Sequence, residues 1–167
     1  VGGLGFFVLA ELAPRPNRIH LSIHTRLVLS ATAVLLVGGT LAMLLLESGN
    51  PRTLGNLGWG ERLLAAWFQS VSPRTAGFNT IDIAAMTTPA LFVTMALMFI
   101  GASPGSTGGG VKTTTFSVTL AALWTTVRGG TEPVVFGRRL SPDTVARAFF
   151  VSLIAFLALN AAAGLML

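Results

Sequence analysis

The sequence predicts an all-α membrane protein, built as a membrane helix, a re-entrant short helix with its loop, and a second membrane helix broken by a glycine-rich segment. Three observations favour this fold class. Only 10% of the residues are charged and 52% are hydrophobic, whereas soluble domains carry about 25% charged residues. Long uncharged stretches alternate with short Arg-bearing segments. The polar stretch SPGSTGGGVKTTT interrupts an otherwise apolar run. We therefore expect the bilayer to be the solvent of this chain.

We expect the first part of the chain to form the end of one membrane span, followed by a polar connector. Residues 1–10 are apolar, and residues 11–26 carry Arg15, Arg18 and Arg26. Neither chain end has the character of a natural terminus, so we expect a fragment of a longer protein. The absence of cysteine excludes disulfides and thiol chemistry.

The next elements are one full span and one helix too short to cross. Residues 27–46 form an uncharged run long enough for about 30 Å of hydrocarbon. A turn-rich loop, 47–58, precedes a stretch with helical apolar spacing over 59–72. That stretch would extend only about 20 Å. Pro73 ends it, and RTAGFNTID follows with little helical character.

The stretch 83–127 is too long for one span, because a continuous helix over it would extend about 67 Å. Lys112 is its sole charged residue. We expect the helix to break at 101–110, which leaves a helical piece on each side. An Arg-rich connector over 128–147 and the beginning of another span over 145–167 follow.

The distribution of positive charge predicts that the helix over 59–72 turns back. The connectors 11–26 and 128–147 hold most of the Arg residues, so both belong on the cytoplasmic side. An even number of crossings must separate them. The stretches 27–46 and 86–127 supply two crossings, so the short helix must enter the membrane and return. Because the basic residues are split between connectors, the net charge of +5 does not indicate nucleic acid as a partner.

A re-entrant helix of this kind suits a monovalent cation. Its carbonyl end carries partial negative charge toward the membrane centre. The extended residues after it can direct backbone oxygens at an ion and replace its hydration shell. No carboxylate lies in this segment before Asp82.

Two motifs make the chain similar to one family. FQSVSPRTAGFNTID resembles the pore loop of the Trk/Ktr/HKT superfamily of potassium transporters, and MFIGASPGSTGGGVKTTTF resembles the broken second helix of that family's third repeat. The resemblance covers essentially the whole chain. It implies the end of the second repeat over 1–26, the third membrane-pore-membrane repeat over 27–127, and a connector with the first helix of the fourth repeat over 128–167.

Within the third repeat, the resemblance implies a pore helix over 59–72, a filter segment over 73–79 and an intramembrane glycine loop over 101–112. It further implies four repeats around one ion path, a homodimer in the bacterial inner membrane, and a cytosolic nucleotide-binding regulatory subunit. Carried over by position, the filter residues that bind potassium are Thr75, Ala76, Gly77 and Phe78. Phe78 and Asn79 replace the tyrosine and second glycine of dedicated potassium channels, so sodium stays open as a second transported ion.

The glycine loop has three readings. A nucleotide-binding loop fails, because Val111 intrudes before Lys112 and no strand or nearby acidic residue accompanies it. A flexible kink for helix packing is the second reading, although the loop holds more glycine than a kink requires. The third reading is a gate beneath the filter, which the resemblance supports. The predicted gate residues are Gly105, Gly108, Gly109, Gly110 and Lys112, with Gly101 as a further hinge.

Several polar residues leave alternatives open. Lys112 either raises an electrostatic barrier to cations or anchors the loop to backbone carbonyls. Arg74 and Asp82 either brace the outer mouth of the filter or mark the extracellular interface. Threonines 113–115 are expected to start a helix. A metal site at His20 and His24 lacks further ligands.

The sequence thus predicts potassium uptake across the plasma membrane through a backbone-carbonyl filter and a gating loop, with no enzymatic step. The alternatives are a potassium/sodium or potassium/proton symporter and a non-conducting membrane scaffold.

Overall fold

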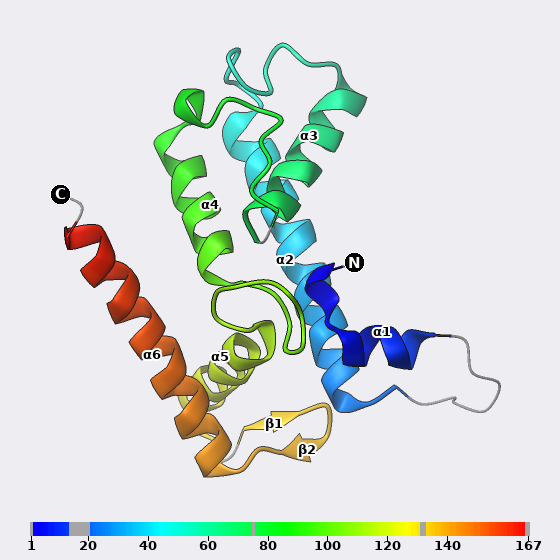
Figure 1. Cartoon of the computed structure of the whole chain (residues 1–167), viewed down its shortest axis with the longest axis vertical. Helices are drawn as coiled ribbons and strands as arrows, with labels where there is room; N and C mark the ends of the chain where they lie inside the picture. The colour runs from blue at the N-terminus through cyan, green and yellow to red at the C-terminus, as the bar shows by residue number, and fades with distance from the viewer. Residues whose placement is uncertain (1, 14–20, 75, 131–132, 166–167) are drawn as a thin grey trace.

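The computed structural model describes residues 2–13, 21–74, 76–130 and 133–165, which form helices arranged around one long helix (Figure 1). That helix, α2 (Ile23–Glu47), is contacted by α1, α3, α4 and α5. Among the described residues, α2 is the helix whose length and apolar composition suffice to cross a membrane. Its 25 residues extend about 37 Å.

The chain reaches α2 through a 3-10 turn, Gly2–Leu4, and a short helix, α1 (Phe6–Leu12). The connector residues Arg15, Arg18 and His20 lie outside the described residues.

Helix α2 begins earlier than the uncharged run at 27 predicts, because a cap rather than hydrophobicity sets its start. The Ser22 side chain accepts a hydrogen bond from the Thr25 backbone N–H at 3.2 Å, which satisfies a free donor of the first turn. Ser22 also donates its backbone N–H and its hydroxyl to the carboxylate of Glu11, at 2.6 and 2.7 Å. The end of α1 is thereby tied to the start of α2.

Helix α3 (Trp59–Val71) occupies the segment for which a short helix over 59–72 is predicted. It packs against α2 and ends beside the middle of that helix. There the Ser70 hydroxyl donates to the Leu36 carbonyl at 3.0 Å. Gly39 permits the close approach, since a Cβ at this position would lie 2.4 Å from Ser70 Oγ.

The chain then returns to the end of α2 from which α3 came. A 3-10 turn, Ser72–Arg74, is followed by residues 76–82 and a second 3-10 turn, Ile83–Ala85. The Thr87 backbone N–H donates to the carboxylate of Glu47, the last residue of α2, at 2.7 Å. Figure 1 shows this returning segment beside α3. The chain between α2 and α4 therefore turns back beside the middle of α2 and returns to the C-terminal end of α2, where it began.

The apolar stretch 83–127 is broken as its length requires. Helix α4 (Thr88–Phe99) and helix α5 (Thr113–Val127) flank the non-helical residues 100–112. With 12 and 15 residues, the two helices extend only about 18 and 22 Å, so neither spans a bilayer by itself.

The connector after α5 contains a hairpin that the all-α prediction does not include. Strands β1 (Val134–Val135) and β2 (Arg138–Arg139) pair antiparallel. Phe136 and Gly137 between them have φ of 48° and 79°, the backbone of a two-residue type I′ turn. The prediction missed it because a phenylalanine stands where such turns usually carry Asn, Asp or Gly. Helix α6 (Pro142–Leu165) completes the described chain.

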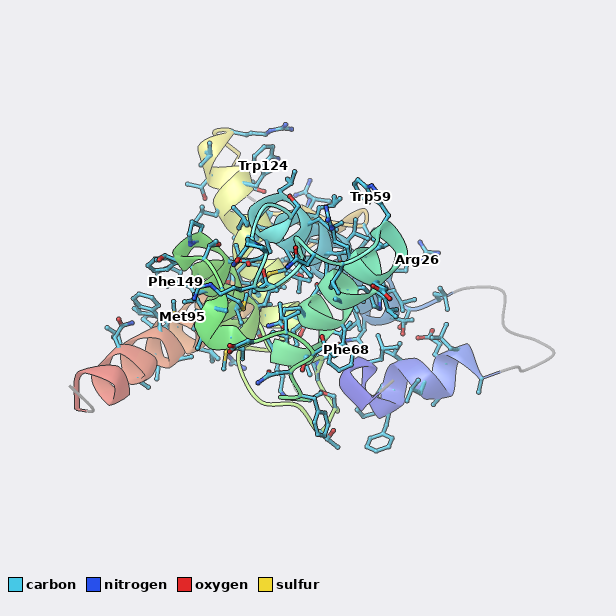
Figure 2. All side chains as sticks on the ribbon, turned by 90° about the horizontal axis from the view of Figure 1, so that it is seen from above. Arg26, Trp59, Phe68, Met95, Trp124 and Phe149 are labelled. Atoms are coloured by element: carbon cyan, nitrogen blue, oxygen red, sulfur yellow. The ribbon has the colours of Figure 1, made fainter. Side chains whose placement is uncertain are left out.

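The buried core lies between α2, α3, α4 and the segments joining them. It consists of Met43, Leu54, Ala66, Ile81, Met86 and Ala90. Large apolar side chains also cover the outside: Trp59 is 80% exposed and Trp124 59% exposed, and both lie at the periphery in Figure 2. Apolar surface of this extent is what lipid or further helices cover.

Candidate functional site

The segment 73–79, which the sequence predicts as the filter, is held at its start by one serine. The Ser72 carbonyl accepts hydrogen bonds from the backbone N–H groups of Ala76 and Gly77, both at 3.0 Å. The Ser72 hydroxyl donates to the Phe78 carbonyl. These bonds use two backbone donors that a membrane interior cannot satisfy with water. Thr75 lies outside the described residues.

Gly77 is required by its conformation rather than by space. Its φ is 69°, yet a Cβ there would meet nothing within 4 Å. An L-residue in the left-handed region costs about 1–2 kcal/mol, so a side chain at this position strains the segment without a clash.

Residues 76–80 are exposed, with Phe78 at 71%. The described part of the predicted filter is therefore not covered by the rest of the chain, and its role as a filter stays a prediction.

The two predicted supports lie in different places. A guanidinium N–H of Arg74 donates to the Gly101 carbonyl at 3.3 Å, so Arg74 reaches the glycine loop. Asp82 caps the turn Ile83–Ala85 by accepting from the Ala84 N–H at 3.0 Å. Arg74 thus joins the segment 73–79 to the glycine loop, and the bracing of the filter mouth by Arg74 and Asp82 stays a prediction.

The ends of the glycine loop are closed by backbone hydrogen bonds. Gly101 N–H donates to the Val111 carbonyl, and Val111 N–H donates to the Phe99 carbonyl, both at 3.0 Å. A Cβ on Gly101 would lie 1.7 Å from the Gly109 carbonyl oxygen. Glycine at 101 is therefore needed because two backbone strands touch there. The predicted hinge role of Gly101 stays a prediction.

The other loop glycines differ from one another. Gly105 and Gly110 have φ of 70° and 77°, a conformation that glycine adopts without cost. Gly108 is buried and Gly109 is exposed. These four residues lie together in one compact loop, and gating by them stays a prediction.

Lys112 is bonded to the glycine loop. Its Nζ donates to the Gly108 carbonyl at 2.6 Å, a contact of the kind that the anchoring alternative requires, and the electrostatic barrier stays a prediction. Lys112 occupies the N-cap position of α5 without a side-chain capping bond. Threonines 113–115 form the first turn of that helix, as predicted, and buried Thr113 donates its hydroxyl to Ser103 Oγ at 3.2 Å.

The segment before α1 is part of the same site, and the sequence prediction missed it. Ser103 N–H donates to the Gly3 carbonyl at 3.0 Å, and Phe6 N–H donates to the Gly105 carbonyl at 3.1 Å. A Cβ on Gly5 would lie 2.4 Å from the Pro104 carbonyl oxygen. The glycines of GGLGFF were the available signal, because such spacing is typical of close backbone approach.

These features define a segment of a helical membrane protein with a short helix that stops midway and a broken helix beside it. Residues 8–164 match the TrkH family, described as cation transport proteins, and the chain belongs to this family. It is a transporter family, which agrees with the prediction that the chain is not an enzyme.

The chain is similar to named potassium uptake proteins. It is 45% identical over 152 residues to Ktr system potassium uptake protein B of Vibrio alginolyticus and 40% identical over 151 residues to the protein of the same name from Bacillus subtilis. It is 41% identical over 155 residues to potassium/sodium uptake protein NtpJ of Enterococcus hirae. The matches cover 90%, 90% and 91% of this chain but 33%, 34% and 34% of the relatives. The chain therefore spans about a third of their length.

Replacing Gly5 with alanine is expected to displace the glycine loop, because the new Cβ would clash with Pro104 and because φ at position 5 is 82°. In a chain without other cysteines, the exposed residue of a Thr107→Cys variant should then react several-fold faster with a water-soluble thiol reagent. Gly38→Ala is the matched control, since a Cβ at position 38 meets nothing within 4 Å. An unchanged labelling rate in Gly5→Ala would show that the contact does not hold the loop.

Proposed function

We propose that this chain is the third repeat of a four-repeat potassium uptake protein in the bacterial inner membrane. In this proposal, 73–79 is one of four filter strands and 101–112 is the gate below it. The observation that carries the proposal is the path of the chain: α3 ends beside Leu36, at the middle of α2, the helix within the described residues that is long and apolar enough to cross a membrane, and the chain returns to Glu47. A segment that turns back halfway is the arrangement that directs backbone oxygens into a membrane pore.

The filter strand binds potassium through backbone oxygens of Thr75, Ala76, Gly77 and Phe78. The left-handed φ of Gly77 supports this role, because alternating backbone conformation is what turns successive carbonyls toward one ion path. Sodium is a second ion in the proposal, since one relative is named a potassium/sodium uptake protein.

The glycine loop lies directly against the filter segment through the bond from Arg74 to Gly101. Closed by its own backbone bonds and anchored by Lys112, the loop blocks the ion path. Small residues allow it to move aside without displacing large side chains.

The proposal also places the chain in a larger assembly. The membrane subunit forms a homodimer, and a cytosolic nucleotide-binding subunit regulates it. The relatives named after the Ktr system support this placement, and the Arg-bearing hairpin β1–β2 lies on the side that charge distribution assigns to the cytoplasm.

Substituting Gly77 with serine is expected to lower the preference of the transporter for potassium over sodium several-fold. The reason is the cost of about 1–2 kcal/mol of a side chain at positive φ, which reorients the filter carbonyls. The measurement is potassium, rubidium and sodium flux from the complete transporter in liposomes. Gly60→Ser is the control, because a Cβ at position 60 meets nothing within 4 Å and lies on α3. An unaltered ion ranking in Gly77→Ser would contradict the filter assignment.

Deleting residues 105–110 is expected to raise potassium flux several-fold without altering the ion ranking, because the gate and the filter are separate segments. Lys112→Met removes the bond to the Gly108 carbonyl and should raise flux by a smaller factor. Flux is compared at equal amounts of reconstituted, folded protein. Wild-type flux in both variants would rule out gating by this loop.

A further inference from the structure

Glu47 is a buried carboxylate that the proposed filter and gate do not use. It is the last residue of α2 and has 0% of its surface exposed. An isolated buried charge is strongly unfavourable, so such a group needs hydrogen-bond donors around it. Met43, one turn earlier on α2, belongs to the apolar core.

Four donors converge on this carboxylate. Oε1 accepts from the backbone N–H and the hydroxyl of Thr87, both at 2.7 Å. Oε2 accepts from the Asn50 amide at 2.9 Å and from the Thr53 hydroxyl. Because these donors fill the acceptor sites of an ionised carboxylate, Glu47 has no free lone pair with which to bind a cation.

Two partners of Glu47 connect it to the part of the chain that follows the proposed filter segment. Thr87 is the N-cap of α4. The Asn50 amide nitrogen also donates to the Ala85 carbonyl at 2.8 Å, so one amide group bridges Glu47 and the turn that follows the filter. The exit of the filter segment is thereby fastened to the end of α2.

The start of the re-entrant segment is hydrogen-bonded to the loop that follows α2, which is also the loop that contains Asn50. The Gly55 N–H donates to the Asn50 carbonyl at 2.7 Å. A guanidinium N–H of Arg62, on α3, donates to the Gly55 carbonyl at 2.9 Å. The start of α3 and the exit at 85–87 therefore both depend on the loop that Glu47 holds.

We infer that Glu47 is a positioning residue for the ion filter, acting through Asn50 and Thr87 on the two ends of the re-entrant segment. The inference rests on the proposed function. Within the described residues, the N–H groups of Ala76 and Gly77 donate to the Ser72 carbonyl and the Phe78 carbonyl accepts from the Ser72 hydroxyl, so the spacing of the filter residues depends on how the flanking ends are held. A shift of the ends changes the fit of the ion, and the ratio of potassium to sodium flux should change more than the amount of folded protein.

The test compares two asparagines of the same loop in the complete transporter, reconstituted in liposomes. Asn50→Ala removes the bridge from Glu47 to Ala85, whereas Asn56→Ala removes only a local bond to the Pro51 carbonyl at 2.8 Å. Glu47→Gln keeps the size of the side chain but turns an amide N–H₂ toward existing donors. We expect a several-fold lower potassium-to-sodium flux ratio in Glu47→Gln and Asn50→Ala, and the wild-type ratio in Asn56→Ala.

A wild-type ratio in folded Asn50→Ala and Glu47→Gln would overturn the inference, and so would a loss of uptake with the ratio unchanged, which indicates a merely structural role. If Glu47→Gln does not fold, Asn50→Ala and Thr87→Val decide, because both leave the carboxylate in place: Asn50→Ala removes one arm, and Thr87→Val removes the hydroxyl donor of the other while its backbone N–H bond remains. Gly77→Ser is measured in parallel. A changed ratio in Gly77→Ser with none in Asn50→Ala refutes only the role of Glu47, whereas no change in Gly77→Ser refutes the filter itself.

Discussion

Satisfying the backbone at the point where α3 stops, beside the middle of α2, is the constraint on which the rest of the structure depends. Water cannot serve the free backbone groups of a helix end inside a bilayer. The protein supplies partners instead: the Ser72 carbonyl accepts from the N–H groups of Ala76 and Gly77, and the Ser72 hydroxyl donates to the Phe78 carbonyl. The Ser70 hydroxyl, donating to the Leu36 carbonyl, holds the end of α3 against α2. Once these groups are satisfied, a short helix can end at that depth and the chain can reverse, which leaves the exposed carbonyl-bearing segment that the proposed filter uses.

The reversal also determines what surrounds it. The bond from Arg74 to Gly101 places the start of the glycine loop against the turning point, and the residues before α1 close over that loop through Gly3 and Phe6. At the C-terminal end of α2, the Glu47 carboxylate accepts hydrogen bonds from the loop after α2 and from the start of α4. The segment 72–78, the glycine loop and residues 3–6 are thus connected by a small set of polar contacts in an otherwise apolar chain.

The sequence predicts those parts of the fold that length and charge decide. The stretch 83–127 is twice as long as a span, so its break follows from arithmetic, and its glycines give the place. Apolar spacing predicts α3, and the Arg-rich connectors predict its return. The start of α2 and the hairpin 134–139 were not predictable in this way, because the Ser22 cap of α2 is held by Glu11 of α1 and because Phe136 adopts an unusual positive φ. The contacts of Glu47 and of Gly5 join residues far apart in the chain, and composition carries no signal for them.

The central claim is that the segment after α3 lines an ion path in the middle of the membrane. The most direct measurement is a crystal structure of the complete transporter with rubidium, whose anomalous scattering locates the ion. The account predicts an anomalous peak on the central axis, at coordination distance from the carbonyl oxygens of 75–78. A structure with residues 73–79 packed against lipid, or with the peak elsewhere on the axis and these carbonyls turned away from it, would contradict the account.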